Sequence, residues 1–296
     1  MKFKKTFVFQ ICAAVLVLIF LLQGSVSAED KNCLWKIETD NNTVYFLGSI
    51  HMLKKECYPL DPAIQDAYND AQIVVFEVNI DSSQSSRAQQ KIMVKAISKD
   101  NTSLKDKLGT DTYQRAAQIL KEAGVNISQF DMFEPWFFSI SLMAMKIQQL
   151  GFDPSYGIDY HFFNKAKKEG KQISSLETID FQISLFDELN IEDQEAMVKQ
   201  TLDEIDLLEE ELQKMIDLWN TGDTEQLEQM VLKSFKNHPR IYHAFLIERN
   251  KAWIDTIEAL LKEDKNSLII SGTAHLLGDS GVLSLLETKG YTVKQL

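Results

Sequence analysis

The chain has 296 residues, of which 45% are hydrophobic and 25% charged, and its formal net charge is −12. This acidic balance argues against nucleic acids and anionic membrane surfaces as electrostatic partners. The length suffices for one large α/β domain or two interlocked halves, and no linker or low-complexity segment divides it.

Residues 1–28 have the three-part pattern of a secretory signal peptide. Three lysines lie within the first five residues, an apolar stretch covers residues 7–22, and Val-Ser-Ala at 26–28 resembles a cleavage site. The rest of the chain, 29–296, carries 28 basic and 43 acidic side chains, a net charge of −15. We therefore expect an exported domain that is secreted, periplasmic or associated with the cell envelope. An uncleaved leader, although short for a span, is the alternative and would be an N-terminal membrane anchor.

Strand patterns occur near both ends of the remaining chain, and helical patterns fill the middle. In chain order, the predicted elements are a hairpin (35–38 and 43–47), a helix after residue 62, a strand (73–78), a long helical segment, a short strand near 172–174, helices (193–219, 224–233, 242–261), a strand before residue 272, a helix (282–289) and a closing strand (291–293). The apolar segment 132–150 is predicted to be a core helix, with a substrate-facing or membrane-touching helix as the alternative. The pattern predicts an α/β (α+β) fold, in which a central mixed sheet is built from the N- and C-terminal parts of the chain around a largely helical middle.

Two strand-like runs, 44–51 and 268–275, end in the same Gly-x-x-His pattern. The first contains Gly48 and His51, and the second contains Gly272 and His275. Ligands of open α/β sheets bind beyond the carboxyl ends of strands, and a glycine there lets the backbone turn sharply. We expect His51 and His275 to share one pocket, and the repeated unit suggests two pseudo-repeated halves. Two ordinary loop histidines are the alternative.

A carboxylate lies in the apolar run 73–78. Burying an unpaired carboxylate costs several kcal/mol, so Glu77 must be paired, protonated, bound to a metal, or at a strand end facing a polar cleft. A plain strand-end ion pair is the structural alternative. Asp159 could support the same pocket by hydrogen bonding, and Glu177 could support it or merely favour the start of a helix.

Cys33 and Cys57 are the only cysteines outside the leader. An oxidising compartment would permit a disulfide between them, which would attach the first strand to the loop that carries His51. Two free thiols are the alternative, because two cysteines are too few for their spacing to decide.

These motifs together resemble the TraB/GumN family, which is related to the Tiki metalloproteases and, more distantly, to the erythromycin esterases. The resemblance covers nearly all of residues 30–296, and Ser49 stands where threonine is commoner. It implies a site made of His51, Glu77, Arg249 and His275. The segments that carry the resemblance are 33–37, 44–51, 58–60, 76–78, 156–159, 176–178 with Gln182, 248–250, and 272–275 followed by 281–282.

Two imidazoles and one carboxylate match the ligand set of divalent metals such as Mn, Co, Zn or Fe. With His51, Glu77 and His275 as metal ligands, a bound water would become a nucleophile near neutral pH. Arg249 could then bind a substrate carboxylate or stabilise an oxyanion. We expect a metal-dependent peptidase acting on a peptide or small-molecule substrate. The alternatives are a metal-free hydrolase with a histidine general base, and a protein that sequesters a peptide or small ligand without cleaving it.

The leader yields a direct prediction. Signal peptidase is expected to cut between Ala28 and Glu29, because small residues occupy the end of the leader. Intact-mass analysis of protein recovered from the cell envelope should give the mass of residues 29–296. A mass that includes the leader would contradict cleavage and indicate an N-terminal anchor.

Overall fold

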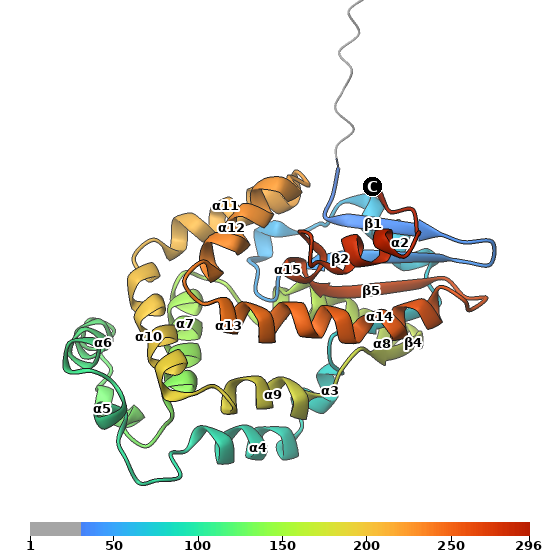
Figure 1. Cartoon of the computed structure of the whole chain (residues 1–296). Coiled ribbons are helices and arrows are strands. Elements are labelled where there is room, and N and C mark those ends of the chain that lie inside the picture. Colours follow the sequence, from blue (N-terminus) through green and yellow to red (C-terminus); the bar gives the residue numbers. More distant parts are fainter. Residues whose placement is uncertain (1–30) are drawn as a thin grey trace, which may run out of the picture. The chain divides into compact units, whose positions relative to one another are not determined.

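A computed structural model describes residues 31–296, so the predicted leader lies outside the described residues. In it, a mixed sheet of six strands has the order β4-β3-β5-β2-β1-β6 (Figure 1). Strands β4, β3, β5 and β2 are parallel neighbours, and β1 pairs antiparallel with β2 and β6. The strands are β1 (Leu34–Glu38), β2 (Thr43–Ser49), β3 (Ile73–Phe76), β4 (Gln172–Ser175), β5 (Ser267–Gly272) and β6 (Lys294–Gln295).

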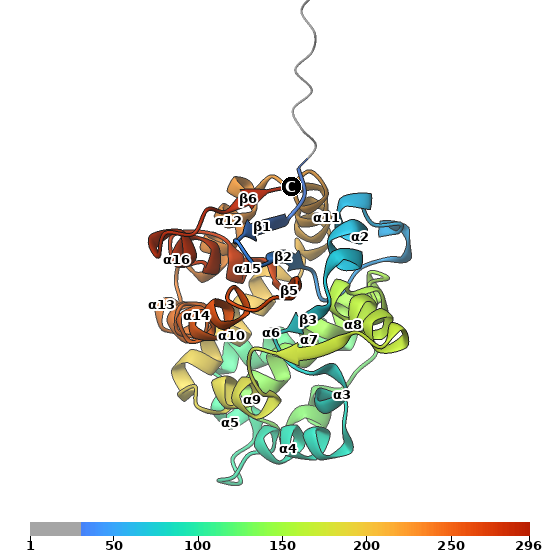
Figure 2. The same cartoon turned by 90° about the vertical axis from the view of Figure 1, so that its right-hand side faces the viewer.

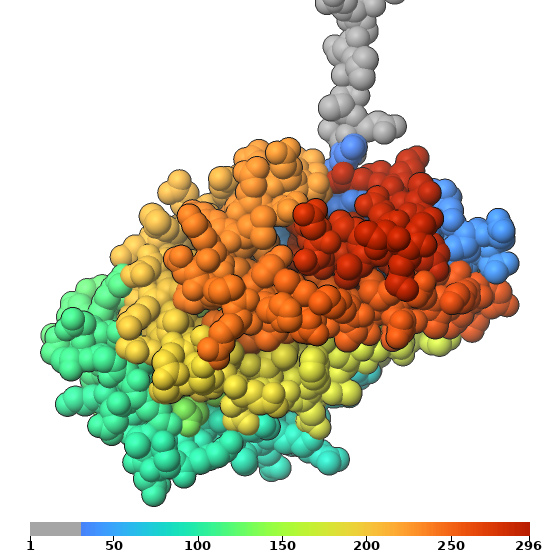
Figure 3. Space-filling view, viewed as in Figure 1, coloured from blue at the N-terminus to red at the C-terminus, as the bar shows by residue number. Residues whose placement is uncertain are grey.

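Both ends of the described chain contribute to this sheet, as predicted. β1 pairs with β6 through Trp35 and Gln295, and the first and last segments lie beside one another on the surface in Figure 3. The two strands of the Gly-x-x-His units, β2 and β5, are direct neighbours in the sheet.

Helices cover both faces of the sheet (Figure 2). α2 (Pro62–Asp70) and α8 (Ile158–Glu169) lie on one face, and α14 (Glu248–Leu260) and α16 (Val282–Thr288) lie on the other. Strand β3 is buried along its whole length because side chains on both faces are covered. The ring of Phe76 packs edge-on against Phe163 of α8, with 5.4 Å between ring centroids.

A second, smaller core joins the helices of the middle segment. Phe138 and Leu142 of α7 (Pro135–Gln149) are buried there against α10 (Ile191–Glu204), which confirms the predicted core helix. The other α-helices are α3 (Ile80–Ser83), α4 (Ser86–Ala96), α5 (Leu104–Lys107), α6 (Thr110–Glu122), α9 (Ile179–Asp187), α11 (Leu208–Asn220), α12 (Thr224–Phe235), α13 (Pro239–Tyr242) and α15 (Thr273–Leu276). No helix within residues 31–296 is long and apolar enough to cross a membrane.

Several predicted boundaries are wrong for identifiable reasons. The helix predicted at 193–219 is two helices, α10 and α11, because Ile205 packs in the helical core whereas Trp219 packs in the sheet core. The closing strand lies at Lys294–Gln295, not at 291–293, because residue 290 is a glycine with φ of +95° and the chain turns there before it reaches β1.

The disulfide predicted between Cys33 and Cys57 is absent from the structure, in which both residues are free thiols. Cys33 is fully buried beside β1, and Cys57 lies half-buried at the end of a short 3-10 helix (Lys55–Cys57). Burial raises the pKa of the Cys33 thiol to about 12, so this cysteine stays protonated and unreactive.

Candidate functional site

The predicted site residues follow the carboxyl ends of the four parallel strands. His51 follows β2, Glu77 follows β3, Glu177 follows β4 and His275 follows β5. Strands β2 and β5 are in register with Ser49 opposite Gly272, so both Gly-x-x-His segments leave the sheet at the same edge. Glu77 lies just past the end of β3, which places its carboxylate at this edge and not inside the sheet.

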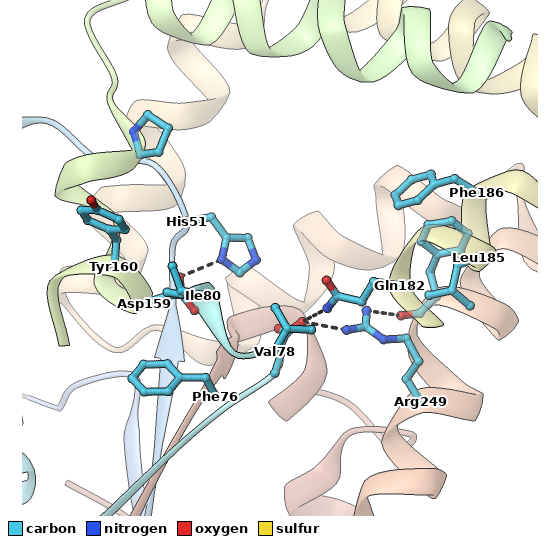
Figure 4. Close-up of a pocket in the computed structure, with 13 residues that line it drawn as sticks. His51, Phe76, Val78, Ile80, Asp159, Tyr160, Gln182, Leu185, Phe186 and Arg249 are labelled. Atoms are coloured by element: carbon cyan, nitrogen blue, oxygen red, sulfur yellow. Dashed lines mark hydrogen bonds and ion pairs between the residues drawn. The ribbon is translucent and has the colours of Figure 1, made fainter. Parts of the chain in front are cut away.

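A cleft of about 390 Å³ opens over this edge. Figure 4 shows Tyr160 on one side of the cleft and Leu185 and Phe186 on the other, with His51 and Gln182 between them. The residues that line it are His51, Phe76, Glu77, Val78, Ile80, Pro154, Asp159, Tyr160, Gln182, Leu185, Phe186, Phe245 and Arg249.

The His51 ring is held by Asp159, a residue that the sequence suggested only as a general hydrogen-bonding support of the pocket. His51 Nδ1 lies 2.8 Å from Asp159 Oδ2, and Ser49 Oγ donates to the other carboxylate oxygen at 2.9 Å. A carboxylate only accepts hydrogen bonds, so a proton lies on Nδ1, and Nε2 is the ring nitrogen that Asp159 does not hold. The charge of Asp159 raises the pKa of His51 to about 9, so at neutral pH Nε2 also carries a proton, which a bound metal would displace. The side chain is 64% exposed, so a molecule in the cleft can reach Nε2.

Gly157 sets the distance between Asp159 and the His51 loop. It precedes α8, and Ile158 N donates to Ile50 O at 3.1 Å. A Cβ atom at residue 157 would lie 2.1 Å from the backbone oxygen of His51. Only glycine therefore permits the approach that brings Asp159 to the imidazole.

His275 is buried and held in the matching orientation. Asn250 Nδ2 donates to Ser280 O at 2.8 Å, which turns Asn250 Oδ1 towards His275 Nδ1 at 2.6 Å. The amide oxygen only accepts, so the proton again lies on Nδ1 and Nε2 is free. Burial lowers the pKa of His275 to about 3 and keeps the ring neutral. Trp253 packs against the ring, with 4.4 Å between centroids.

Glu77 lies between the two histidines as an ionised carboxylate. Burial would raise its pKa, but the charges of His51 and Arg249 and the hydrogen bond from Gly272 N outweigh burial and hold the pKa below its usual range. Oε1 accepts from Gly272 N at 2.7 Å and lies 4.0 Å from His275 Nε2. A Cβ at Gly272 would lie 3.3 Å from Glu77 Oε1, 3.5 Å from His51 Nε2 and 3.8 Å from His275 Cδ2. The carboxylate and the two imidazoles therefore meet beside this glycine.

The other motif glycine, Gly48, allows the two loops to pack together. A Cβ at Gly48 would lie 2.8 Å from Thr273 Oγ1, which itself donates to Ser49 O at 3.0 Å. Trp219 Nε1 donates to the Gly48 carbonyl at 2.7 Å. The β2 and β5 loops are therefore fixed to one another as well as to the sheet.

Arg249 is buried, with 7% exposure, and its hydrogen bonds go to the protein. Nη2 donates to Glu77 Oε2 at 2.7 Å and also to Glu177, Nε donates to Glu177 Oε1 and Oε2 at 3.1 Å, and Nη1 donates to Phe245 O at 3.0 Å. We expected the Arg249 guanidinium to be free to bind a substrate, but in the structure it is bound to protein groups. Arg249 instead joins two carboxylates, Glu77 and Glu177.

A π-helical turn (His243–Ile247) immediately precedes α14 and supplies the Phe245 carbonyl. Such turns are frequent at functional sites. Here it lies inside the predicted helix 242–261 and leads directly to Arg249. Glu177 completes the cluster by accepting from Trp253 Nε1 at 3.1 Å and Gln182 Nε2 at 2.7 Å.

The donor chemistry of the site fits a divalent metal. The two histidines lie beside a carboxylate oxygen of Glu77, and Asp159 and Asn250 hold their Nδ1 atoms in the way that second partners hold metal-binding histidines. Within residues 31–296, no group of three His, Cys, Asp or Glu side chains is close enough together to hold a metal ion in this structure.

The chain is similar to known proteins over most of its length. The model of the TraB/PrgY/gumN family matches residues 33–295. The chain belongs to this family. It is 24% identical over 247 residues to the uncharacterized protein YbaP of Escherichia coli (strain K12), which covers 83% of this chain and 88% of YbaP. Its similarity to the uncharacterized YbaP of Shigella flexneri is of the same extent. No solved structure matches the chain significantly.

The structure brings together every predicted site residue except the two cysteines. Sequence reasoning gave no role to Gly157, Gln182, Asn250 and Trp253, which complete the cluster. One signal was available: Trp253 and Ile257 repeat at helical spacing, and the same stripe passes through residues 249 and 250. The polar partners could thus have been assigned to the buried face of α14.

The contact at Gly157 is testable by unfolding. Gly157→Ala should lower the free energy of unfolding by more than about 3 kcal/mol, because its Cβ meets a backbone atom that cannot move aside. The control is Gly124→Ala, at φ +74° with nothing within 4 Å of the added Cβ, which should cost about 1 kcal/mol from backbone strain alone. Urea unfolding measures both, and equal losses would contradict the proposed close approach.

Proposed function

We propose that this TraB/PrgY/gumN protein is a metal-dependent hydrolase of the cell envelope, a peptidase of the Tiki kind. The observation that carries the proposal is the pair of histidines, each held at Nδ1 by a polar partner, on either side of an ionised glutamate that lines the cleft together with His51. A sheet edge of this kind, with convergent polar groups and shifted pKa values, is where α/β enzymes place their chemistry.

His51, Glu77 and His275 would hold the metal. When bound, a divalent metal lowers the pKa of water and polarises a carbonyl. Asp159 and Asn250 hold a proton on Nδ1 of each imidazole, so Nε2 is the atom that would bind the metal, in His51 after loss of its second proton. Arg249 and Glu177 act as positioning residues, because they fix the Glu77 carboxylate without being free themselves.

The metal is tested first by binding. In titration calorimetry with Mn²⁺, Co²⁺ and Zn²⁺, the wild type should show one site, and His51→Ala and His275→Ala should each weaken it at least 10-fold. His243→Ala is the matched control, because its side chain is 57% exposed and lies outside the cluster. Equal binding by all four proteins would remove the metal from the site.

Turnover separates this function from its alternatives. The protein is incubated with a mixed pool of peptides, and products and bound peptides are measured by mass spectrometry. Cleavage that is lost on chelation and restored by metal is the expected result. Cleavage that survives chelation would indicate a metal-free hydrolase, and bound but uncut peptide would indicate a sequestering protein.

A further inference from the structure

One end of the cleft has an apolar wall, to which α9 and the π-helical turn contribute side chains. The polar groups that line the cleft beside it include those of His51, Asp159, Glu77 and Gln182. The apolar wall consists of Leu185, Phe186 and Phe245, of which Figure 4 shows Leu185 and Phe186 at one end of the cleft.

The apolar wall is rigidly built. The Phe186 ring packs edge-on against Phe245, with 4.7 Å between centroids, and stacks on buried Trp136 at 5.6 Å. Phe245 is fixed in turn, because its carbonyl accepts from Arg249. The backbone of Phe245 is thus held by the same arginine that holds Glu77, and Phe186 packs on Phe245.

We propose that this wall is a side-chain subsite for an apolar residue of a peptide substrate, next to the bond that is cleaved. The inference rests on the proposed function. A polar side chain placed against Leu185 and Phe245 would lose its water without gaining a hydrogen bond there, whereas an apolar one gains by leaving water.

Gln182 favours a peptide over other apolar ligands. Its Nε2 donates to both Glu77 and Glu177, at 3.2 Å and 2.7 Å, so its orientation is fixed by two carboxylates that can only accept. Figure 4 shows the Gln182 oxygen directed away from Arg249 into the open space. No donor among residues 31–296 hydrogen-bonds to this oxygen, which leaves it to accept from a peptide N–H beside the apolar wall.

The test is a change of specificity. An equimolar pool of acetylated octapeptides, varied at one central position, is presented to the metal-loaded wild type and to Leu185→Glu. The wild type should prefer Leu, Phe or Met over Lys by roughly 10- to 100-fold in cleavage. Leu185→Glu should reverse the order in favour of Lys, because it places a carboxylate in the wall. Leu232→Glu, on an exposed leucine of α12, is the matched control and should leave the preference unchanged.

The same pool is also measured by equilibrium filtration, so that binding is read without turnover. Apolar preference in binding without any cleavage would overturn the hydrolase and retain the subsite. Cleavage with no preference at the varied position, or a Leu185→Glu profile equal to wild type, would overturn the subsite and retain the hydrolase. Circular dichroism checks that both variants are folded, and Leu185→Lys, expected to favour Asp and Glu, gives a second test of the same wall.

Discussion

The site depends on one buried ion cluster, in which Arg249 lies between Glu77 and Glu177. Each carboxylate follows a different parallel strand, and the arginine comes from a helix on the face of the sheet. Charges buried to this degree are tolerated only when they are paired and hydrogen-bonded. The cluster therefore fixes how α14 sits against the strand ends, and with it Asn250, Trp253 and His275.

The cluster also explains why Glu77 stays ionised although it is buried. An isolated buried carboxylate takes up a proton, whereas here Arg249, His51 and the Gly272 N–H stabilise its charge. Both oxygens are held, by Gly272 on one side and by Arg249 and Gln182 on the other. The carboxylate is thus prepared in position before any ligand enters, which is the condition for accurate metal or substrate binding.

Much of this site was visible in the sequence because its signals are local. Each Gly-x-x-His segment joins a strongly β-forming run to a glycine and a histidine, and strand ends of one parallel sheet must meet at one edge. The partners supplied by helices were not visible as partners, since Gln182 and Asn250 look like any polar helix residue. Arg249 lies near Glu248 and Lys251, which are both exposed, so the sequence did not indicate that Arg249 is buried. The break between α10 and α11 was equally hidden, because it arises from two separate cores and not from a helix-breaking residue.

The most direct measurement of the central claim is the coupling between Arg249 and its two carboxylates. By urea unfolding, Arg249→Met should lose about 3 to 5 kcal/mol, because it leaves two buried charges unpaired. The triple variant Glu77→Gln, Glu177→Gln, Arg249→Met should recover most of that loss, whereas Arg240→Met, at an arginine whose side chain is 70% exposed, should cost no more than about 1 kcal/mol. A small loss for Arg249→Met, or a triple variant whose losses simply add, would contradict the account.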